Sequence, residues 1–591
     1  MTRKLARVLP HRVKPLIGVE DTSYGAWVAR FDTLRGGDRA KIKSRIEAMT
    51  YRPLISVILP INNPSPVFLR RAVKSVVKQI YSTWELCVAA DDSAAPALRQ
   101  ILDRYGAADP RIRVAYRAEN GNISRAGNSA LSLATGEFVA LLDHDDELAP
   151  HALYMIAEEL AAHADADLVY SDEDEVDTKG RRSSPYFKTD WNPDLFLAQN
   201  ILSRLCAFRT SAVRQLGGFR EDFEGSQDYD LALRVIERTE PRRIRHVPHV
   251  LYHRRAAPGS LVVAAKEHGG AAARRAVSDH FQRLGISAAV TAAPIGDYQR
   301  VKYRLRSPVP RVSIVVPTTD RLDLVERCVD GILHRTDYGN LEILIVDNRS
   351  VEEATLRYFA RIAGNPRVRI LPYDAPFNFS AINNFAARRA TGEILVLLNN
   401  DTEVINADWL AEMAANAQRP EVGAVGAKLL YPNDTVQHGG VIVGVGGLAD
   451  HASKNLPRSS PGYFGRAQLA QNFSAVTAAC LALRKNVFDE VGGLNEADLR
   501  VAFNDVDLCL RIREKGYLVV WTPYAELYHH ESATRGSDAT PERRPEFEQE
   551  MRFLKEKWGK VLRDDPYYNP NLSLRRASFE LAFPPRVAKP W

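Results

Sequence analysis

Two apolar runs in the sequence end abruptly in carboxylates and amides. The first is ALLDHDDEL at residues 140–148, and the second is VLLNNDTEV at residues 396–404. Carboxylate oxygens are the ligands that hard divalent cations such as Mg²⁺ and Mn²⁺ prefer, and a short acidic cluster leaves coordination positions free for phosphate. A solvated acidic loop explains either run alone equally well. Because both runs follow the same tetrapeptide, ATGE, their recurrence favours a cation site.

The two runs offer different ligands. The first offers three carboxylates and the second offers one carboxylate beside two amides: Asp143, Asp145 and Asp146, against Asp401 with Asn399 and Asn400. A metal ion that bridges a diphosphate neutralises the charge that develops as a nucleoside diphosphate leaves. The pattern therefore suggests chemistry at a diphosphate.

A second pair of acids lies further along, in GSQDYDLALR and AFNDVDLCLR. Asp228 and Asp505 fall near the start of an expected helix, where a carboxylate is either a helix cap or a general base that takes a proton from an incoming hydroxyl. Asp230 and Asp507, two residues on, are better candidates for capping or packing. Because both copies keep the first acid, we favour the base.

Two histidines follow strand-like segments, His253 after HVLY and His529 after AELY. A lone histidine after a strand is usually structural. Each of these lies about 25 residues beyond the expected base in matched surroundings, which favours a contact with metal or phosphate. His530 could substitute for His529.

These motifs belong to an internal repeat. Ser124 matches Ser380 and Asn128 matches Asn384 at an offset of 256, which also relates the two acidic runs. The offset grows to 276 and 277 at the histidines and the expected bases. The second copy therefore carries an insertion, which we expect to include QHGGVIVGVGGLADHAS.

Each copy alternates strand-like and helix-like segments. Continuous β-branched runs such as LISVILP and RVSIVVP, each followed by a helical pattern, predict an α/β fold with mostly parallel sheets wrapped by helices. Ligands bind such sheets beyond the carboxyl ends of the strands. The acids therefore lie where a ligand is expected.

The chain divides into five predicted parts. They are a helical N-terminal extension, a first domain, a linker, a second domain, and a C-terminal helix with a tail: residues 1–51, 52–292, 293–311, 312–536 and 537–591. The N-terminal part includes a predicted helix in DRAKIKSRIEAM. Phe547, Met551, Leu554 and Trp558 follow the spacing of an amphipathic helix, which we expect to pack on the second domain, with a membrane-lying helix as the alternative.

The composition excludes some classes of protein. The 79 basic residues nearly cancel 73 acidic ones in 591, and the net charge of +6 argues against a nucleic-acid binder. The five cysteines are far apart, so we expect free thiols. We find no apolar run long enough to span a bilayer and no secretory signal, and we expect a cytoplasmic protein. The basic segment MTRKLARVLPHRVKPLIG is either a tail or a peripheral membrane contact.

Taken together, SVILP, ADDS, DHDD, SQDYD, VSIVVPT, VDNRS, LLNND, FNDVDLCLR and LYHHESATRG resemble glycosyltransferase family 2 with the GT-A nucleotide-diphosphosugar fold. The resemblance spans about residues 53–560 and is greatest to tandem-domain bacterial members of the O-antigen and surface-polysaccharide type, including rhamnosyltransferase-like proteins. It implies a metal-dependent, inverting transfer from a UDP- or dTDP-sugar donor to a growing glycan, and a lipid-linked acceptor would place the chain at the inner face of the cytoplasmic membrane.

The resemblance also implies a role for each matching residue. Asp228 and Asp505 would be the catalytic bases. Asp145, His253, Asp401 and His529 would hold Mg²⁺ or Mn²⁺. The donor would contact the residues at the remaining matched strand ends: Pro60, Asp91, Asp143, Pro317, Asp347, Asn399 and Asn400.

The first copy departs from the family pattern. Ala90 stands opposite Asp347, so the first copy lacks the acid that would contact the nucleotide unless the strand slips to present Asp91. Asn62 occupies a position where the family often has an aromatic ring. Two readings stay open: either both domains are catalytic, or only the second is and the first binds nucleotide sugar or acceptor, or serves as a scaffold.

Two other functions are weighed against this interpretation. A processive synthase shares these motifs but needs a membrane channel and usually a QxxRW motif, and we find neither in the sequence. A non-catalytic module that binds nucleotide sugars would tolerate Asp505→Asn, whereas an enzyme would not.

Overall fold

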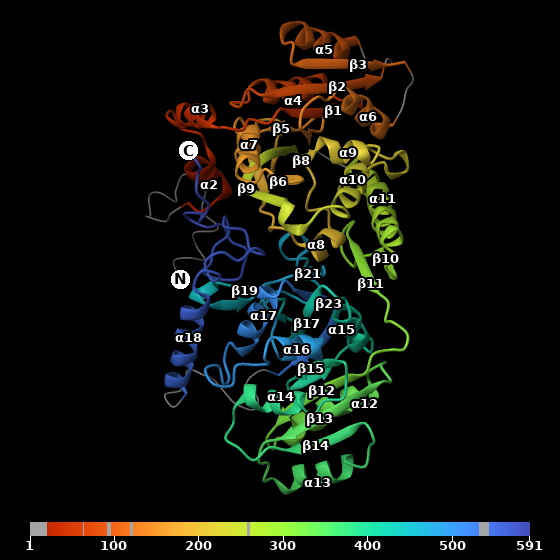
Figure 1. Ribbon diagram of the computed structural model, residues 1–591, viewed down its shortest axis with the longest axis vertical. Coiled ribbons are helices and arrows are strands. Elements are labelled where there is room, and N and C mark those ends of the chain that lie inside the picture. Colours follow the sequence, from red (N-terminus) through yellow and green to blue (C-terminus); the bar gives the residue numbers. More distant parts are fainter. Residues whose placement is uncertain (1–20, 63, 92–95, 119–121, 257–260, 531–542) are drawn as a thin grey trace.

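The computed structural model describes residues 21–591 except 63, 92–95, 119–121, 257–260 and 531–542. The basic N-terminal segment therefore lies outside the described residues. Figure 1 shows an elongated molecule with one large sheet toward each end and the C-terminal tail beside the junction. The two sheets follow the two copies of the sequence repeat.

The first sheet has nine strands in the order β3-β2-β1-β4-β8-β6-β9-β5, with β7 added to β6. Strands β3, β2, β1 and β4 run parallel, and β8 pairs antiparallel with both β4 and β6. The strands are β1 (Ile55–Pro60), β2 (Trp84–Asp91), β3 (Ile112–Arg117), β4 (Phe138–Leu141), β5 (Glu147–Leu148), β6 (Leu168–Val176), β7 (Arg182–Tyr186), β8 (Cys206–Arg209) and β9 (Ile244–Arg255).

The second sheet repeats this order as β14-β13-β12-β15-β22-β17-β23-β16. Strands β18 and β21 are added to β17 and β23. Its strands are β12 (Val312–Thr318), β13 (Leu341–Asp347), β14 (Val368–Pro372), β15 (Ile394–Leu398), β16 (Thr402–Val404), β17 (Val422–Leu430), β18 (Val436–His438), β21 (Gln471–Asn472), β22 (Cys480–Arg484) and β23 (Leu518–His529). The predicted α/β class is confirmed, with parallel strands in one half of each sheet and mixed pairing in the other.

Helices cover both faces of each sheet. Successive residues of a strand point to opposite faces, so a continuously apolar strand has side chains to bury on both of them. Val57 and Leu59 pack in one apolar cluster, and Ile58 packs in another. The first domain contains α4 (Pro66–Val77), α5 (Pro96–Ala108), α6 (Ile123–Leu133), α7 (Ala152–Ala162), α8 (Pro193–Ala198), α9 (Thr210–Gln215), α10 (Gln227–Ile236) and α11 (Leu261–Leu284). The second contains α12 (Leu322–His334), α13 (Glu353–Ile362), α14 (Phe379–Ala387), α15 (Trp409–Ala417), α16 (Lys485–Glu490) and α17 (Asn504–Glu514).

The two sheets differ in the register of their last strands. Glu147 and Glu403 are matching residues of β5 and β16, yet Glu147 pairs with His253 and Glu403 pairs with Tyr528. The neighbouring strands β6 and β17 give the same result. His253 therefore occupies the position equivalent to Tyr528, one residue before His529, with which the sequence match had paired it.

This shift changes which side chain faces the ligand-binding end of the sheet. Since side chains alternate along a strand, a one-residue slip exchanges the two faces. Arg254, and not His253, takes the place of His529.

The segments outside the sheets join the two halves. Helix α3 (Asp38–Ala48) confirms the predicted N-terminal helix, and it follows α2 (Tyr24–Trp27) and a π-helix, η2 (Val28–Asp32). The interval predicted as a linker contains β11 (Gln299–Tyr303), which pairs with β10 (Ala288–Ala292). The expected insertion contains β19 (Val441–Val443), β20 (Ala449–His451) and two 3-10 helices, Val445–Gly447 and Tyr463–Gly465.

The C-terminal region contacts both domains. Helix α18 (Arg544–Trp558) packs on the second domain as predicted, since Leu554 is fully buried there and the Trp558 indole donates to Asp507 at 2.9 Å. The tail beyond it returns to the first domain, where the Asn569 amide donates to Asp172 at 2.9 Å. The tail thus holds the two domains together.

Candidate active sites

A cavity of about 750 Å³ lies at the carboxyl ends of the central strands of the second sheet. Six residues that the sequence assigns to the site line it: Pro317, Asn399, Asn400, Asp401, Asp505 and His529. The expected metal ligands and the expected base therefore share one cleft.

The pair formed by Asp401 and His529 is suited to a cation. The ring Nε2 of His529 lies 3.1 Å from Oδ1 of Asp401, and its Nδ1 lies 2.7 Å from Oε1 of Gln437. Because that amide oxygen can only accept, Nδ1 carries a proton, and in the neutral imidazole Nε2 then presents a lone pair. Oδ1 of Asp401 is buried and receives no hydrogen bond from any residue that the structure describes.

Two acceptor atoms thus face each other, an arrangement that a shared cation would satisfy. Asn399, at the first position of the motif, donates to the same Nε2 at 3.3 Å. Within the described ranges no group of three or more His, Cys, Asp or Glu side chains is placed to hold a metal ion. Mg²⁺ sites that also bind phosphate commonly use one or two carboxylates, so Asp401 fits such an ion, and the imidazole of His529 would add a nitrogen ligand.

Asp505 lies in the first turn of α17, at the edge of the cleft. Its Oδ2 accepts a hydrogen bond from the Ala478 backbone at 3.0 Å, and its Oδ1 accepts one from Val506 at 2.8 Å. The residue at the N-cap is Phe503, so Asp505 does not cap the helix. Asp507 packs as expected, with Arg511 and α18 as partners. Asp505 is held in place and faces the cavity.

The donor side of this cleft differs in detail from the expectation. Asp347 ends β13 and accepts from the Ser350 backbone at 3.0 Å, but it lies outside the described residues that line the cavity. Its neighbour Asn348 lines it instead, together with Thr318, which accepts from the Asn400 amide at 2.9 Å. Asn348 was not among the residues predicted from the sequence, although it lies in the same VDNRS motif.

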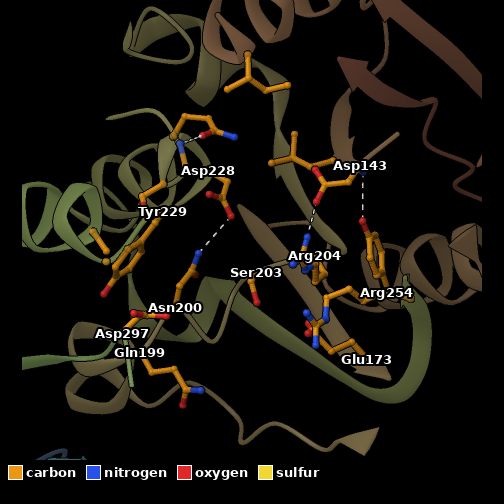
Figure 2. A pocket seen from close by; sticks show the side chains of 18 of the residues that line it. Asp143, Glu173, Gln199, Asn200, Ser203, Arg204, Asp228, Tyr229, Arg254 and Asp297 are labelled. Atoms are coloured by element: carbon orange, nitrogen blue, oxygen red, sulfur yellow. Dashed lines mark hydrogen bonds and ion pairs between the residues drawn. The ribbon is translucent and has the colours of Figure 1, made fainter. Parts of the chain in front are cut away.

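The first domain has a cavity of about 550 Å³ at the equivalent end of its sheet. Pro60, Asp143 and Asp228 line it, as Figure 2 shows for the two acids. The Asn200 amide donates to Asp228 at 3.2 Å. Desolvation raises the pKa of the Asp228 carboxyl, and the nearby charge of Asp143 raises that pKa further. The expected base of the first domain thus also faces a cleft.

The expected metal set does not assemble in the first domain. His253 turns away from the cavity and its Nδ1 lies 2.6 Å from the buried Asp174, which also pairs with Arg182 and accepts from the Tyr24 hydroxyl at 2.7 Å. Asp145 and His253 both lie outside the described residues that line the cavity. His253 therefore does not join the predicted metal set in this structure, because the register of β9 directs its ring to the opposite face.

The remaining acids of the first run already have partners. Asp143 forms an ion pair with Arg204. Asp146 is 2% exposed and accepts from the Tyr252 hydroxyl and the Arg255 backbone, both at 2.7 Å. Burial raises the pKa of Asp146 to about 7. Because Asp143 and Asp146 already have these partners, a divalent cation would have to displace them in order to bind.

The nucleotide end of the first cavity follows the sequence comparison. Pro60 pairs with Ala89 in the first sheet, and Pro317 pairs with Val346 in the second. Ala90 is therefore the residue of the first domain that is equivalent to Asp347, as expected. The side chain of Asp91 lies outside the described residues, so whether it reaches a donor stays a prediction.

The second domain adds one residue to the wall of the first cavity that the sequence did not indicate, Phe464, whose ring stacks on that of Tyr186 with the centroids 4.1 Å apart.

Comparisons with known proteins match both halves of the chain. The family model for glycosyl transferase family 2 matches residues 56–217 and 313–492. An uncharacterised protein of Sinorhizobium fredii is 47% identical over 97% of this chain, and an O-antigen biosynthesis protein of Myxococcus xanthus is 40% identical over 96%. The chain spans 63% and 44% of the length of these two relatives.

Similarity to solved structures is lower. A mannosyltransferase of Pyrobaculum calidifontis, in complex with GDP-mannose and Mn²⁺, has 20% identity over 52% of this chain and 77% of its own, with a TM-score of 0.33. No helix in the described part of the chain is both long and apolar enough to cross a bilayer. One family match falls in each of the two sheet-bearing domains, ending before β9 in the first and before β23 in the second, and together they span more than half of the chain. The chain belongs to glycosyl transferase family 2.

Proposed function

We propose that this chain is an inverting glycosyltransferase that moves a sugar from a nucleotide-sugar donor to a growing surface glycan. The observation that carries the proposal is the shared cleft of Asp401, His529 and Asp505. Family membership supports the reaction class, and the O-antigen relative supports a glycan acceptor. A lipid-linked acceptor at the inner face of the cytoplasmic membrane is part of the proposal.

The chemistry of the second domain follows from the position of Asp505. Its carboxylate takes the proton from the acceptor hydroxyl while that oxygen bonds to the anomeric carbon. The bond from this carbon to the diphosphate oxygen breaks, and the nucleoside diphosphate leaves with the electron pair. A single displacement inverts the configuration at the sugar carbon.

Asp401 and His529 would hold Mg²⁺ or Mn²⁺, which when bound stabilises negative charge on the leaving diphosphate. Asn348 and Thr318 lie on the nucleotide side of the same cleft, where they can hydrogen-bond a UDP or dTDP base or ribose. The cleft thus separates a diphosphate end from a base-bearing end.

The first domain admits two functions. Asp228 faces a cavity and its pKa is raised, which suits a base that takes up a proton. Ala90 in place of an acid, together with the occupied acids of the first run, favours the alternative that this domain binds donor or acceptor while the second carries out the transfer.

The test is sugar transfer by the full chain with a panel of UDP-, dTDP- and GDP-sugars, with products detected by mass spectrometry. Asp505→Asn should lower turnover by about 10²–10⁴-fold, the range that a general base contributes. Asp330→Asn, at an exposed carboxylate of α12, serves as the matched control and should keep full turnover. Full turnover in both Asp505→Asn and Asp228→Asn would refute the assignment of the bases.

A further inference from the structure

Two of the matching positions at which the cavities differ place a guanidinium in the first domain. The register of β8 and β22 matches Ala207 with Ala482, because each pairs with the corresponding residue of β4 or β15. Counting back by the same three residues, Arg204 takes the place of Ala479. Arg254 takes the place of His529, as the register of β9 requires.

Arg204 is held toward the acids of the first run. Its guanidinium pairs with Asp143 and lies 3.5 Å from Oδ2 of Asp146. Figure 2 shows it between Asp143 and Arg254 at the edge of the cavity. Its backbone has a φ of 75°, a left-handed conformation that is strained for a residue other than glycine. Such strain persists where surrounding contacts enforce a position.

Three acids at or beside this wall pair with cations of the protein itself, and Arg254 pairs with Glu175. Glu173, the other acid beside Arg254, pairs with the buried Lys188 at 2.8 Å. Asp143 and Asp146 share Arg204. In the second domain, by contrast, Asp401 keeps a buried oxygen that accepts no hydrogen bond from the described residues.

We propose that the first domain binds the diphosphate of its nucleotide ligand without a divalent cation, with the Arg204 guanidinium where the second domain uses a metal ion. Arginine presents a planar fork of donors that matches phosphate oxygens and stays charged at every physiological pH. Arg254, on the same wall, supplies a second cation. This inference rests on the proposed function, since it takes a nucleoside diphosphate as the ligand.

Nucleotide binding to the full chain tests the proposal by isothermal titration with UDP, dTDP and GDP, each with Mn²⁺ and with excess EDTA. Four proteins are compared: wild type, Asp401→Asn, Arg204→Ala and the double variant. Arg204→Ala installs the residue type found at Ala479. We expect an EDTA-resistant site in the wild type and in Asp401→Asn, and a Mn²⁺-dependent site in the wild type and in Arg204→Ala.

The expected loss at the first site is large. Arg204→Ala should weaken EDTA-resistant binding at least about tenfold, because a hydrogen-bonded charge contributes more than one factor of ten. Arg204→Lys should retain part of it, which separates lost charge from misfolding. Arg45 lies on α3 and forms an exposed ion pair with Glu158 of α7. Arg45→Ala should leave nucleotide binding at both sites unchanged.

Other outcomes would overturn the inference. These are no EDTA-resistant binding to Asp401→Asn, a Mn²⁺ requirement at both sites, or EDTA-resistant binding that survives in Arg204→Ala. Failure of the proposed function is a separate result, since a chain that transfers no sugar can still bind nucleotides in this pattern.

Discussion

The two domains repeat one sheet, yet they satisfy the acids at its carboxyl edge in different ways. In the second domain, Asp401 and His529 face each other as two acceptors. In the first, Asp143 and Asp146 face Arg204, and His253 lies on the other side of the strand. The same topology therefore carries an Asp–His pair suited to a cation in one copy and an internal ion pair in the other.

The difference comes from small changes in the chain. The histidine of the LYH motif stands one residue nearer the strand's proline in β9 than in β23, so the two rings point to opposite faces. In addition, one arginine before β8 takes the place of an alanine before β22. Neither change disturbs the strand order, because the buried apolar residues of both sheets keep their pattern. Duplicated domains can thus diverge in electrostatics while they keep one fold.

The strongest test of this comparison changes the two matching aspartates. Asp401→Asn should lower metal-dependent transfer by at least about a hundredfold, since even the outer partners of a metal contribute 10–100-fold. Asp145→Asn should change it less than about twofold, because Asp145 lies outside the described lining of its cavity. Initial rates at saturating Mn²⁺ give both values, and equal losses in the two variants would contradict the comparison.

The two histidines should separate metal binding from stability. His529→Ala should raise the Mn²⁺ concentration needed for half-maximal transfer by about 10–100-fold. His253→Ala should leave that concentration unchanged and destabilise the first domain by about 1–3 kcal/mol, because it removes one hydrogen bond to the buried Asp174, which keeps Arg182 and Tyr24 as partners. Burial raises the pKa of Asp174, but His253 and Arg182 bring it below its ordinary value. Metal titrations and urea unfolding measure the two effects.

Much of this could be predicted from the sequence. The continuous apolar runs around Val57 and Ile314 indicate buried parallel strands, and the polar residues after them indicate the ligand edge. The repeat then placed Asp401 and Asp505 in one cleft, because matched positions in matched sheets meet at the same edge. Residues fixed by strand order and by local pattern were thus accessible without a structure.

The position of the His253 ring has a physical cause that the sequence does contain. Matching the LYH motifs aligns His253 with His529, but the preceding prolines give another answer. His253 lies five residues after Pro248, whereas His529 lies six residues after Pro523. In a strand of period two, an odd and an even count fall on opposite faces. The direction of the Arg204 side chain could not be predicted from the sequence, because it depends on a left-handed backbone conformation that no sequence motif indicates.

A buried histidine side chain of strand β9 extends the comparison of the two domains to their pH dependence. The register matches His246 of β9 with Trp521 of β23. Burial alone would lower the pKa of His246, but the carboxylates of Asp172 and Asp190, 2.9 and 3.0 Å away, raise it to about 9. A raised histidine pKa stabilises the folded state fully below the unfolded value of 6.5, and this stability is lost as the pH rises through about 9.

We therefore expect the first domain to lose on the order of 3 kcal/mol of stability between these two pH values, whereas the second domain has no titrating side chain at this position. Urea unfolding at the two pH values, followed by domain-specific hydrogen exchange, measures the loss. His246→Gln should remove the pH dependence at this site, and a pH-dependent loss that persists in this variant would assign it to another group.

The smallest expected effect concerns the wall that one domain lends to the other. Phe464 of the second domain stacks on Tyr186 and lines the first cavity, whereas the described lining of the second cavity comes from residues 317–546 alone. Phe464→Ala should weaken EDTA-resistant nucleotide binding by about two- to tenfold, the range that an aromatic pair contributes, and leave Mn²⁺-dependent binding unchanged. Equal effects at both sites would indicate a general loss of stability; an effect at the first site alone would show that the second domain completes the first cavity.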